Sequence, residues 1–149
     1  MPAAPLRQGR VPMRLSEPRF IRLPKIDDPR GSLTFLEAGS CVPFEIKRVF
    51  YLYELTAGAV RAGHALQTCE QLIVAAAGAF EVVAKDGVST ARWTLNSASN
   101  GLYVPAMTWL EIRDFLPGSV CLVLASERYS EDSYIRSWEE FSEAASRRR

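Results

Sequence analysis

The chain has 149 residues, of which 48% are hydrophobic and 23% are charged, and its formal net charge at pH 7 is +1. This length suits a single domain, and the composition is that of an ordinary globular protein. The near-neutral charge gives no electrostatic argument for a nucleic-acid or membrane partner, and no apolar run reaches the roughly 18 residues of a membrane span.

The N-terminal segment, residues 1–18, contains Pro2, Pro5, Pro12 and Pro18 and has little hydrophobic periodicity. We interpret this segment as a flexible tail. It lacks the continuous apolar stretch of a signal peptide. The chain has three cysteines, an odd number without CxxC spacing, which argues against a disulfide framework. We therefore expect a cytoplasmic location, and we interpret residues 147–149 as a short basic tail.

Short strand-like segments follow one another along most of the remaining chain. Asp27–Gly31 has the composition of a turn, Lys47–Leu55 alternates at period two, and Lys85–Val88 contains the Asp-Gly signature of a hairpin. The other strands are expected at Arg19–Leu23, Ser32–Glu37, Glu70–Ala77, Ala79–Ala84, Thr90–Leu95, Leu102–Val104, Leu110–Asp114 and Val120–Ser126.

The C-terminal segment Ser133–Ala145 is different, because its apolar residues recur at helical spacing. Ile135, Trp138, Phe141 and Ala145 form one apolar stripe, and Asp132 or Ser133 could cap the helix. The pattern predicts an all-β sandwich or barrel over residues 19–146, with a C-terminal α-helix packed against it.

The one histidine of the chain, His64, lies in a segment with a recognisable spacing. Gly58, His64 and Glu70 stand at the intervals of the first signature motif of the cupin barrels, and Gly78 comes one residue late. The segment resembles that motif, which implies a jelly-roll-like cupin fold. Leu66 stands where the second histidine of the motif would be. Without the resemblance, a lone histidine can equally be a structural residue at a strand end.

A second segment that begins at Pro105 resembles the second cupin motif, and here Leu110 replaces a histidine. Divalent metals need nitrogen, oxygen or sulfur ligands, and leucine offers none. With His64 and Glu70 as the remaining candidates, we expect no metal and no other cofactor. A cupin without metal must work by acid–base chemistry or by binding alone.

Further motifs occur in order over residues 19–141. They are Asp28–Leu33, Pro43–Tyr51, Arg61 with His64, Gln71–Ile73, Gly101–Pro105, Trp109, Leu122–Ser126, Tyr129 and Tyr134–Arg136. In this order they resemble the cupin-fold sugar-nucleotide 3,4-ketoisomerases, which include the WxcM-like proteins. The resemblance implies a homodimer that moves the keto group of a dTDP-4-keto-6-deoxyhexose from C4 to C3 in deoxysugar biosynthesis.

Such a keto shift needs a base for the C3 proton, groups that stabilise an enediol, and return of a proton to C4. The resemblance implies that His64 is the acid/base, with Arg61 and Tyr51 assisting. The expected substrate-binding residues are Arg30, Arg48, Tyr103, Trp109, Glu70, Leu66 and Leu110. A guanidinium fork matches phosphate oxygens, which makes Arg48 a candidate diphosphate anchor, although a surface salt bridge is an equal alternative.

Several of these residues have a second interpretation. The aromatic rings of Tyr103 and Trp109 can stack on a base or sugar, or can belong to the core. Glu70 either orients an imidazole or lies in solvent. Leu66 and Leu110 make the pocket more apolar than in the relatives. The alternative function is therefore a catalytically altered or inactive cupin that binds a nucleotide-sugar.

Overall fold

The computed structural model describes residues 17–149, so the expected N-terminal tail up to residue 16 lies outside the described residues. Strands follow one another to residue 135, and a helix comes after them. The elements are β1 (Arg19–Arg22), β2 (Lys25–Asp28), β3 (Gly31–Thr34), β4 (Arg48–Leu52), β5 (Arg61–Leu66), β6 (Gln71–Ala77), β7 (Phe80–Lys85), β8 (Thr90–Leu95), β9 (Asn100–Val104), β10 (Trp109–Arg113), β11 (Val120–Ala125), the 3₁₀ turn η1 (Glu131–Ser133), β12 (Tyr134–Ile135) and α1 (Trp138–Arg147).

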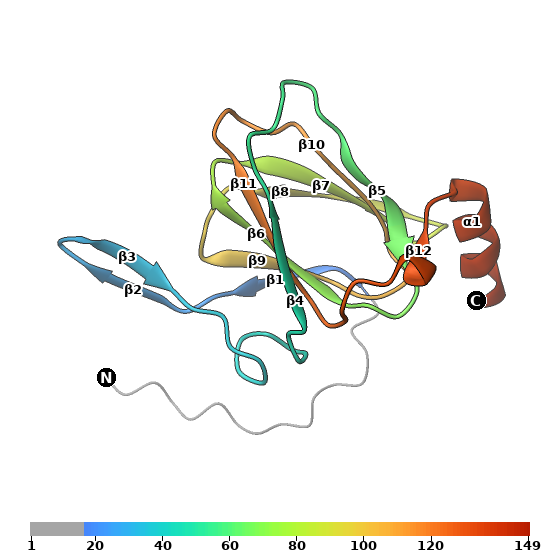
Figure 1. Cartoon of the computed structure of the whole chain (residues 1–149), viewed down its shortest axis with the longest axis horizontal. Coiled ribbons are helices and arrows are strands. Elements are labelled where there is room, and N and C mark those ends of the chain that lie inside the picture. The colour runs from blue at the N-terminus through green and yellow to red at the C-terminus, as the bar shows by residue number, and fades with distance from the viewer. Residues whose placement is uncertain (1–16) are drawn as a thin grey trace.

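Two five-stranded antiparallel sheets form the body of the protein (Figure 1). The first has the order β1-β9-β6-β11-β4, and the second has the order β12-β5-β10-β7-β8. Neighbouring strands are often distant in the sequence, as in jelly-roll-like barrels. The expectation of an all-β barrel with a C-terminal helix is confirmed.

The main core lies between the two sheets and follows the period-two alternation of the strands. Ile73 of β6 and Val123 of β11 point inward from the first sheet, and Val82, Leu110 and Ile112 meet them from the second. All of these side chains are buried. The opposite face of the first sheet carries a second buried cluster that includes Leu23, Leu72 and Tyr103.

Side chains join the two sheets at both of their edges. On one side, the ring of Phe20 in β1 meets that of Trp93 in β8 edge to face, with centroids 5.0 Å apart. On the other side, Arg48 of β4 donates a hydrogen bond to the Tyr134 hydroxyl of β12, at 3.4 Å. The second edge therefore places charged and polar groups where β4 and β12 face each other.

Strands β2 and β3 form a hairpin that projects away from the barrel (Figure 1). The strands run over residues 25–28 and 31–34. The turn is therefore shorter than the expected Asp27–Gly31, and the second strand begins at Gly31 rather than at Ser32. Asp28 closes this turn by accepting hydrogen bonds from the backbone and the guanidinium of Arg30. Ile26 and Leu33 pair across the hairpin, and both are more than half exposed.

The sequence does not predict strand β5, because Gly63 and the polar residues Arg61 and His64 interrupt its alternation. It pairs with β10, and the register shifts between Leu110 and Glu111. Ala62 and Gly63 both have positive φ, 67° and 73°, at this irregularity. A bulge of this kind turns the following side chains relative to the sheet.

The C-terminal helix starts later than expected, at Trp138 rather than Ser133. Tyr134 and Ile135 pair with β5 instead, so these two residues are strand and not helix. Ser137 is the N-cap, because its side chain accepts a hydrogen bond from the Glu140 backbone. Of the helices in residues 17–149, none is both long and apolar enough to cross a membrane.

The glycine at position 78 allows two turns of the barrel to approach each other. Its φ is +70°, and an added Cβ would lie 2.7 Å from the Ser119 Cα. Ser119 is buried there and accepts a hydrogen bond from the Ala79 backbone. Gly58 has a similar φ of +76°, but a Cβ at that position meets nothing within 4 Å.

Gly78→Ala should therefore destabilise the fold more than Gly58→Ala. Both changes strain the backbone by about 1 kcal/mol, and Gly78→Ala adds an overpacking cost of roughly 1–3 kcal/mol. Urea unfolding of the two variants and the wild type measures the difference. Equal stability of the two variants would contradict the close approach of Gly78 and Ser119.

Candidate active site

His64 points into the barrel from β5. Its Cα is paired with that of Leu110, whose side chain belongs to the core between the sheets. Residues paired across antiparallel strands project to the same face, so His64 shares the inner face with Leu110. The bulge at Ala62 and Gly63 comes directly before His64, where it sets the direction of the imidazole.

Three strands bring side chains together around this imidazole. The Tyr134 ring lies edge-on to the His64 ring, with centroids 4.8 Å apart and an interplanar angle of 67°. The Tyr134 hydroxyl accepts a hydrogen bond from Arg48 Nη1 at 3.4 Å. Because β4 and β5 belong to different sheets, Tyr134 connects the two edges of the barrel at the histidine.

An outer layer of charged and aromatic groups covers this cluster. The Arg136 guanidinium lies 4.5 Å from the Tyr134 ring centroid, and it binds the Glu131 carboxylate at 2.8 and 3.1 Å. Tyr129 donates its hydroxyl proton to Glu131, and its ring lies 5.6 Å from the Arg48 guanidinium carbon. The bonds from Arg136 and Tyr129 lower the pKa of the Glu131 carboxyl to about 2.

Two buried nitrogen atoms of the cluster have no hydrogen-bond partner in the part of the chain that the structure describes. They are Nδ1 of His64 and Nε of Arg48. Buried polar groups are normally hydrogen-bonded, and unsatisfied ones concentrate at functional sites. These two atoms flank Tyr134 and mark the region where polar groups of a ligand can be received.

The electrostatics around His64 favour its neutral form. Burial lowers the pKa of the imidazole below its usual 6.5, and the positive charges of Arg136 and Arg48 lower the pKa further. The Ala62 carbonyl, whose effect exceeds that of Arg48, and the Glu131 carboxylate act in the opposite direction, but the pKa stays below its usual value. A neutral imidazole at pH 7 is ready to accept a proton, as a general base must be.

The two leucines at motif positions are both buried beside these polar groups. Leu110 belongs to the barrel core, and Leu66 packs with Cys69, Ala125 and Tyr134. Leu66 is also the strand partner of Tyr134. The base of the site is therefore apolar, while its polar groups come from Arg48, His64 and Tyr134.

Glu70 turns away from the imidazole. Its carboxylate accepts a hydrogen bond from the Tyr103 hydroxyl at 2.5 Å. Tyr103 is buried in the cluster on the outer face of the first sheet, so it does not line the barrel interior. Desolvation and Glu70 raise the pKa of the Tyr103 phenol. Within residues 17–149, no group of three or more His, Cys, Asp or Glu side chains has the arrangement of a metal site.

Three other expected residues also lie away from His64. Trp109 faces outward and packs under α1, where its ring contacts those of Trp138 and Phe141 at 5.4 and 5.8 Å. Tyr51 is 58% exposed on the outer face of β4, and Arg61 is exposed at the start of β5. Alternation along a strand explains these positions, because neighbours of an inward residue point outward.

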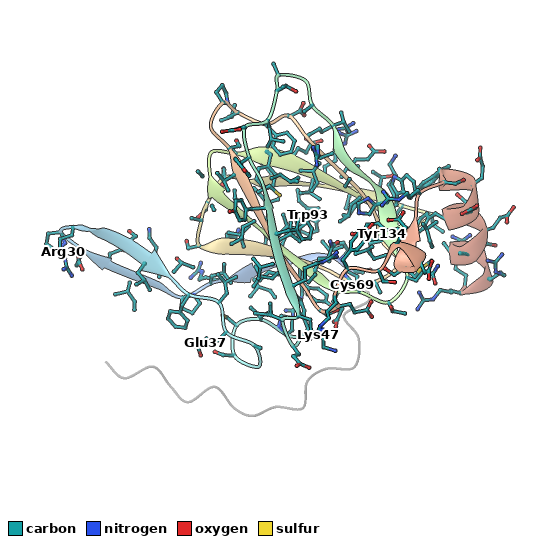
Figure 2. The ribbon with its side chains drawn as sticks, in the orientation of Figure 1. Arg30, Glu37, Lys47, Cys69, Trp93 and Tyr134 are labelled. Carbon is teal, nitrogen blue, oxygen red and sulfur yellow. The ribbon has the colours of Figure 1, made fainter. Side chains whose placement is uncertain are left out.

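Arg30 is at the end of the molecule remote from this cluster. Figure 2 shows Arg30 at the tip of the β2–β3 hairpin and Tyr134 beside β12, on opposite sides of the barrel. Within one chain, the structure thus brings together His64, Arg48, Leu66 and Leu110 of the expected site residues. It does not bring Arg30, Arg61, Tyr51, Glu70, Tyr103 or Trp109 to the imidazole.

Sequence reasoning gave no role to Tyr129, Glu131, Tyr134 or Arg136, although three of them were part of the family pattern. Their signal was a dense run of aromatic and charged residues between the last long strand and the helix. Helical periodicity predicts that part of this run belongs to the helix. Periodicity cannot predict that Tyr134 and Ile135 pair with β5 instead. The two-residue strand β12 is too short to produce a pattern.

The chain was compared with known proteins. The model of the FdtA family, described as WxcM-like, C-terminal, matches residues 16–146. A TDP-4-oxo-6-deoxy-alpha-D-glucose-3,4-oxoisomerase of Aneurinibacillus thermoaerophilus is 39% identical over 125 residues, which cover 84% of this chain and 90% of the relative.

Solved structures are similar over most of their length. A 3,4-ketoisomerase from Helicobacter canadensis has a TM-score of 0.84 and 36% identity, covering 87% of this chain and 97% of that one. The sugar 3,4-ketoisomerase QdtA from Thermoanaerobacterium thermosaccharolyticum, in complex with TDP, has a TM-score of 0.87 and 33% identity, covering 91% and 98%. A histidine-to-asparagine variant of QdtA was solved in complex with TDP-4-keto-6-deoxyglucose, with a TM-score of 0.87, 32% identity and the same coverage.

The environment of His64 predicts that it titrates below pH 6.5 in the folded protein. The single histidine makes this testable by NMR, since its ring protons give one titration curve in a chain without a histidine tag. The unfolded chain should titrate near the model value, at about 6.5.

The same shift affects stability. As the pH falls below 6.5, the unfolded state takes up a proton that the folded site resists, so His64 makes the fold less stable in this range. A folded-state pKa at or above the unfolded value would show that the imidazole is not held in its neutral form.

Proposed function

The chain belongs to the FdtA family, whose model is described as WxcM-like, C-terminal, and we propose that it is a 3,4-ketoisomerase of nucleotide-linked sugars. Its reaction moves the keto group of a dTDP-4-keto-6-deoxyhexose from C4 to C3 in deoxysugar biosynthesis. The relative at 39% identity is a TDP-4-oxo-6-deoxyglucose 3,4-oxoisomerase, and QdtA binds TDP and TDP-4-keto-6-deoxyglucose.

The observation that carries this proposal is a half-buried neutral imidazole, on the inner face of β5, whose buried Nδ1 has no partner among the described residues. His64 takes the C3 proton of the sugar and returns a proton to C4 on the same face. A single base can do both, because the two carbons are adjacent in the planar enediol. General base catalysis of this type contributes about 10²- to 10⁴-fold in rate.

Arg48 is the anchor for the anionic part of the substrate in this proposal. Its Nη1 is directed to Tyr134, whereas its buried Nε has no partner among the described residues. A guanidinium with a free donor can bind a phosphate oxygen. Leu66 and Leu110 form the apolar base of the pocket and pack against the ring and methyl group of a deoxysugar.

A second function is favoured by the same two leucines. They remove proton-transfer groups from the pocket, so a protein that binds the nucleotide-sugar without converting it is the alternative. The structure of the barrel is the same for both functions. Turnover separates them, because binding alone raises the melting temperature in the presence of dTDP without producing a new ketone.

Incubation of the protein with dTDP-4-keto-6-deoxyglucose should yield a 3-keto product detectable by NMR. His64→Gln should reduce kcat by about 100-fold or more, because it removes the base. The control is Val88→Thr, since Val88 is 74% exposed in the β7–β8 turn and should leave the rate unchanged. Binding of dTDP without turnover of this and related nucleotide-ketosugars would replace the first function by the second.

We further propose that the protein is a homodimer in the cytoplasm, where its thiols stay reduced. The β2–β3 hairpin supports a dimer, since a projecting two-stranded hairpin is marginally stable alone. Its exposed apolar pair, Ile26 and Leu33, needs a partner surface. Val49 and Tyr51 on the outer face of β4, 57% and 58% exposed, provide one in a second copy.

Reciprocal docking of the two hairpins gives a twofold dimer with the same contact made twice. In such a dimer Arg30 at the hairpin tip leaves its own barrel and reaches the other copy. The substrate-binding role expected for Arg30 therefore requires the dimer.

Ile26→Asp combined with Leu33→Asp should convert the dimer to monomer, because the hairpin would present two charges to an apolar surface. Sedimentation equilibrium measures the mass. Val88→Asp, at an exposed apolar position away from the hairpin, should leave the dimer intact. A monomeric wild type, or a dimer that survives the double change, would contradict this interface.

A further inference from the structure

The lone histidine can move the proton between the two carbons, but a keto shift must also move a proton between the two oxygens. O4 begins as a carbonyl and ends as a hydroxyl, whereas O3 changes in the opposite sense. The resemblance offered Arg61 and Tyr51 to assist His64 and Tyr103 to bind the substrate, and the structure turns none of them toward His64.

The five tyrosines of the chain all lie in the described residues and can be compared directly. The Tyr103 hydroxyl donates to Glu70, and the Tyr129 hydroxyl donates to Glu131. Tyr51 and Tyr53 are both more than half exposed, and their rings contact each other at 5.4 Å. Only Tyr134 contacts the His64 ring in this set.

The hydrogen bond from Arg48 determines how the Tyr134 hydroxyl can act. Arg48 Nη1 is the donor, so the Tyr134 oxygen is the acceptor and keeps its own proton free to donate. When that proton has left, the Arg48 guanidinium beside the oxygen and the Arg136 guanidinium over the ring stabilise the phenolate. Tyr134 is thus equipped both to give a proton and to take one back.

We propose that Tyr134 is the second proton-transfer residue of the reaction, carrying the proton between the two sugar oxygens while His64 carries the one between the carbons. This inference rests on the proposed isomerase function. Tyr134 also lies beside Leu66, its strand partner. Its side chain packs against Leu66, the position where the related motif has its second histidine.

The steps balance without a further reactant. His64 takes the C3 proton, the C3–H electron pair forms the C3–C4 double bond, and the C4 carbonyl pair moves to O4, which takes the Tyr134 proton. The phenolate then removes the O3 proton, and the C3 carbonyl forms. The electron pair of the double bond takes the proton from the His64 imidazolium at C4. Both side chains return to their starting states.

Tyr134→Phe is the main test, because it removes the hydroxyl and keeps the ring that packs against His64 and Leu66. We expect kcat for dTDP-4-keto-6-deoxyglucose to fall about 100-fold or more while KM changes by less than about threefold. Exchange of the C3 proton with D₂O should slow in parallel, since enolisation needs the proton donor at O4. Tyr53→Phe is the matched control and should retain the wild-type rate.

Tyr134→His is the second variant and keeps a proton-transfer group at the site. We expect it to restore at least about tenfold over Tyr134→Phe and to add a pH dependence near the imidazole pKa of about 6.5. Wild-type kcat in Tyr134→Phe, or a loss confined to KM, would overturn the role of Tyr134. A wild-type protein without turnover would instead contradict the isomerase function itself. An active wild type with an equally active Tyr134→Phe would contradict only the role of Tyr134.

Discussion

The contact of Arg48 with Tyr134 across the open edges of the two sheets is the interaction on which the site depends. At their other edges the sheets are joined by an edge-to-face contact between the aromatic rings of Phe20 and Trp93. At β4 and β12 the joining side chains are a guanidinium and a phenol. Polar groups are kept there at the entrance to an apolar barrel, and His64 is held against the phenol ring.

The charge balance follows from that arrangement. Burial of the imidazole, and then the positive charges of Arg136 and Arg48, lower the pKa of His64 and favour its neutral form. Glu131 moderates this effect by binding Arg136, but it lies outside the cluster and also accepts a hydrogen bond from the Tyr129 hydroxyl. The carboxylate is thereby kept from pairing directly with the histidine. A direct pair would favour the imidazolium, which cannot act as the initial base.

Much of the fold could be predicted from the sequence, because strands with one buried face show alternating apolar and polar residues. The Asp-Gly turn before β8 and the pattern of Lys47–Leu55 are examples. Strand β5 could not be found in this way, since its bulge and its small residues break the alternation. The start of α1 was misplaced because Ile135 fits the helical stripe but is held in β12 by β5.

The site was harder to predict than the fold for a related reason. Motif matching identifies a residue but not the face on which it lies, and Tyr51, Tyr103 and Trp109 all alternate with inward-facing neighbours. His64 was found because it is the one histidine of the chain and stands at a cupin-like spacing. Arg48 was found because it lies in a family motif and a guanidinium matches phosphate oxygens. Tyr134 also lies in a family motif, but an aromatic residue near a helix start is equally typical of packing.

The two leucines are easier to understand once the proton transfers are divided between two side chains. A second histidine at position 66 would bring another titrating group next to Tyr134, Arg48 and His64, where the positive charges already oppose protonation. Leucine removes that competition and lowers the local polarity, which strengthens the electrostatic effect of Arg48 on the phenol oxygen. A site with fewer titratable groups can therefore perform the same shift, provided that the remaining base and the remaining hydroxyl lie on the same side of the sugar. The edge-on contact of the His64 and Tyr134 rings, with centroids 4.8 Å apart, makes the two groups immediate neighbours, as this division of the proton transfers requires.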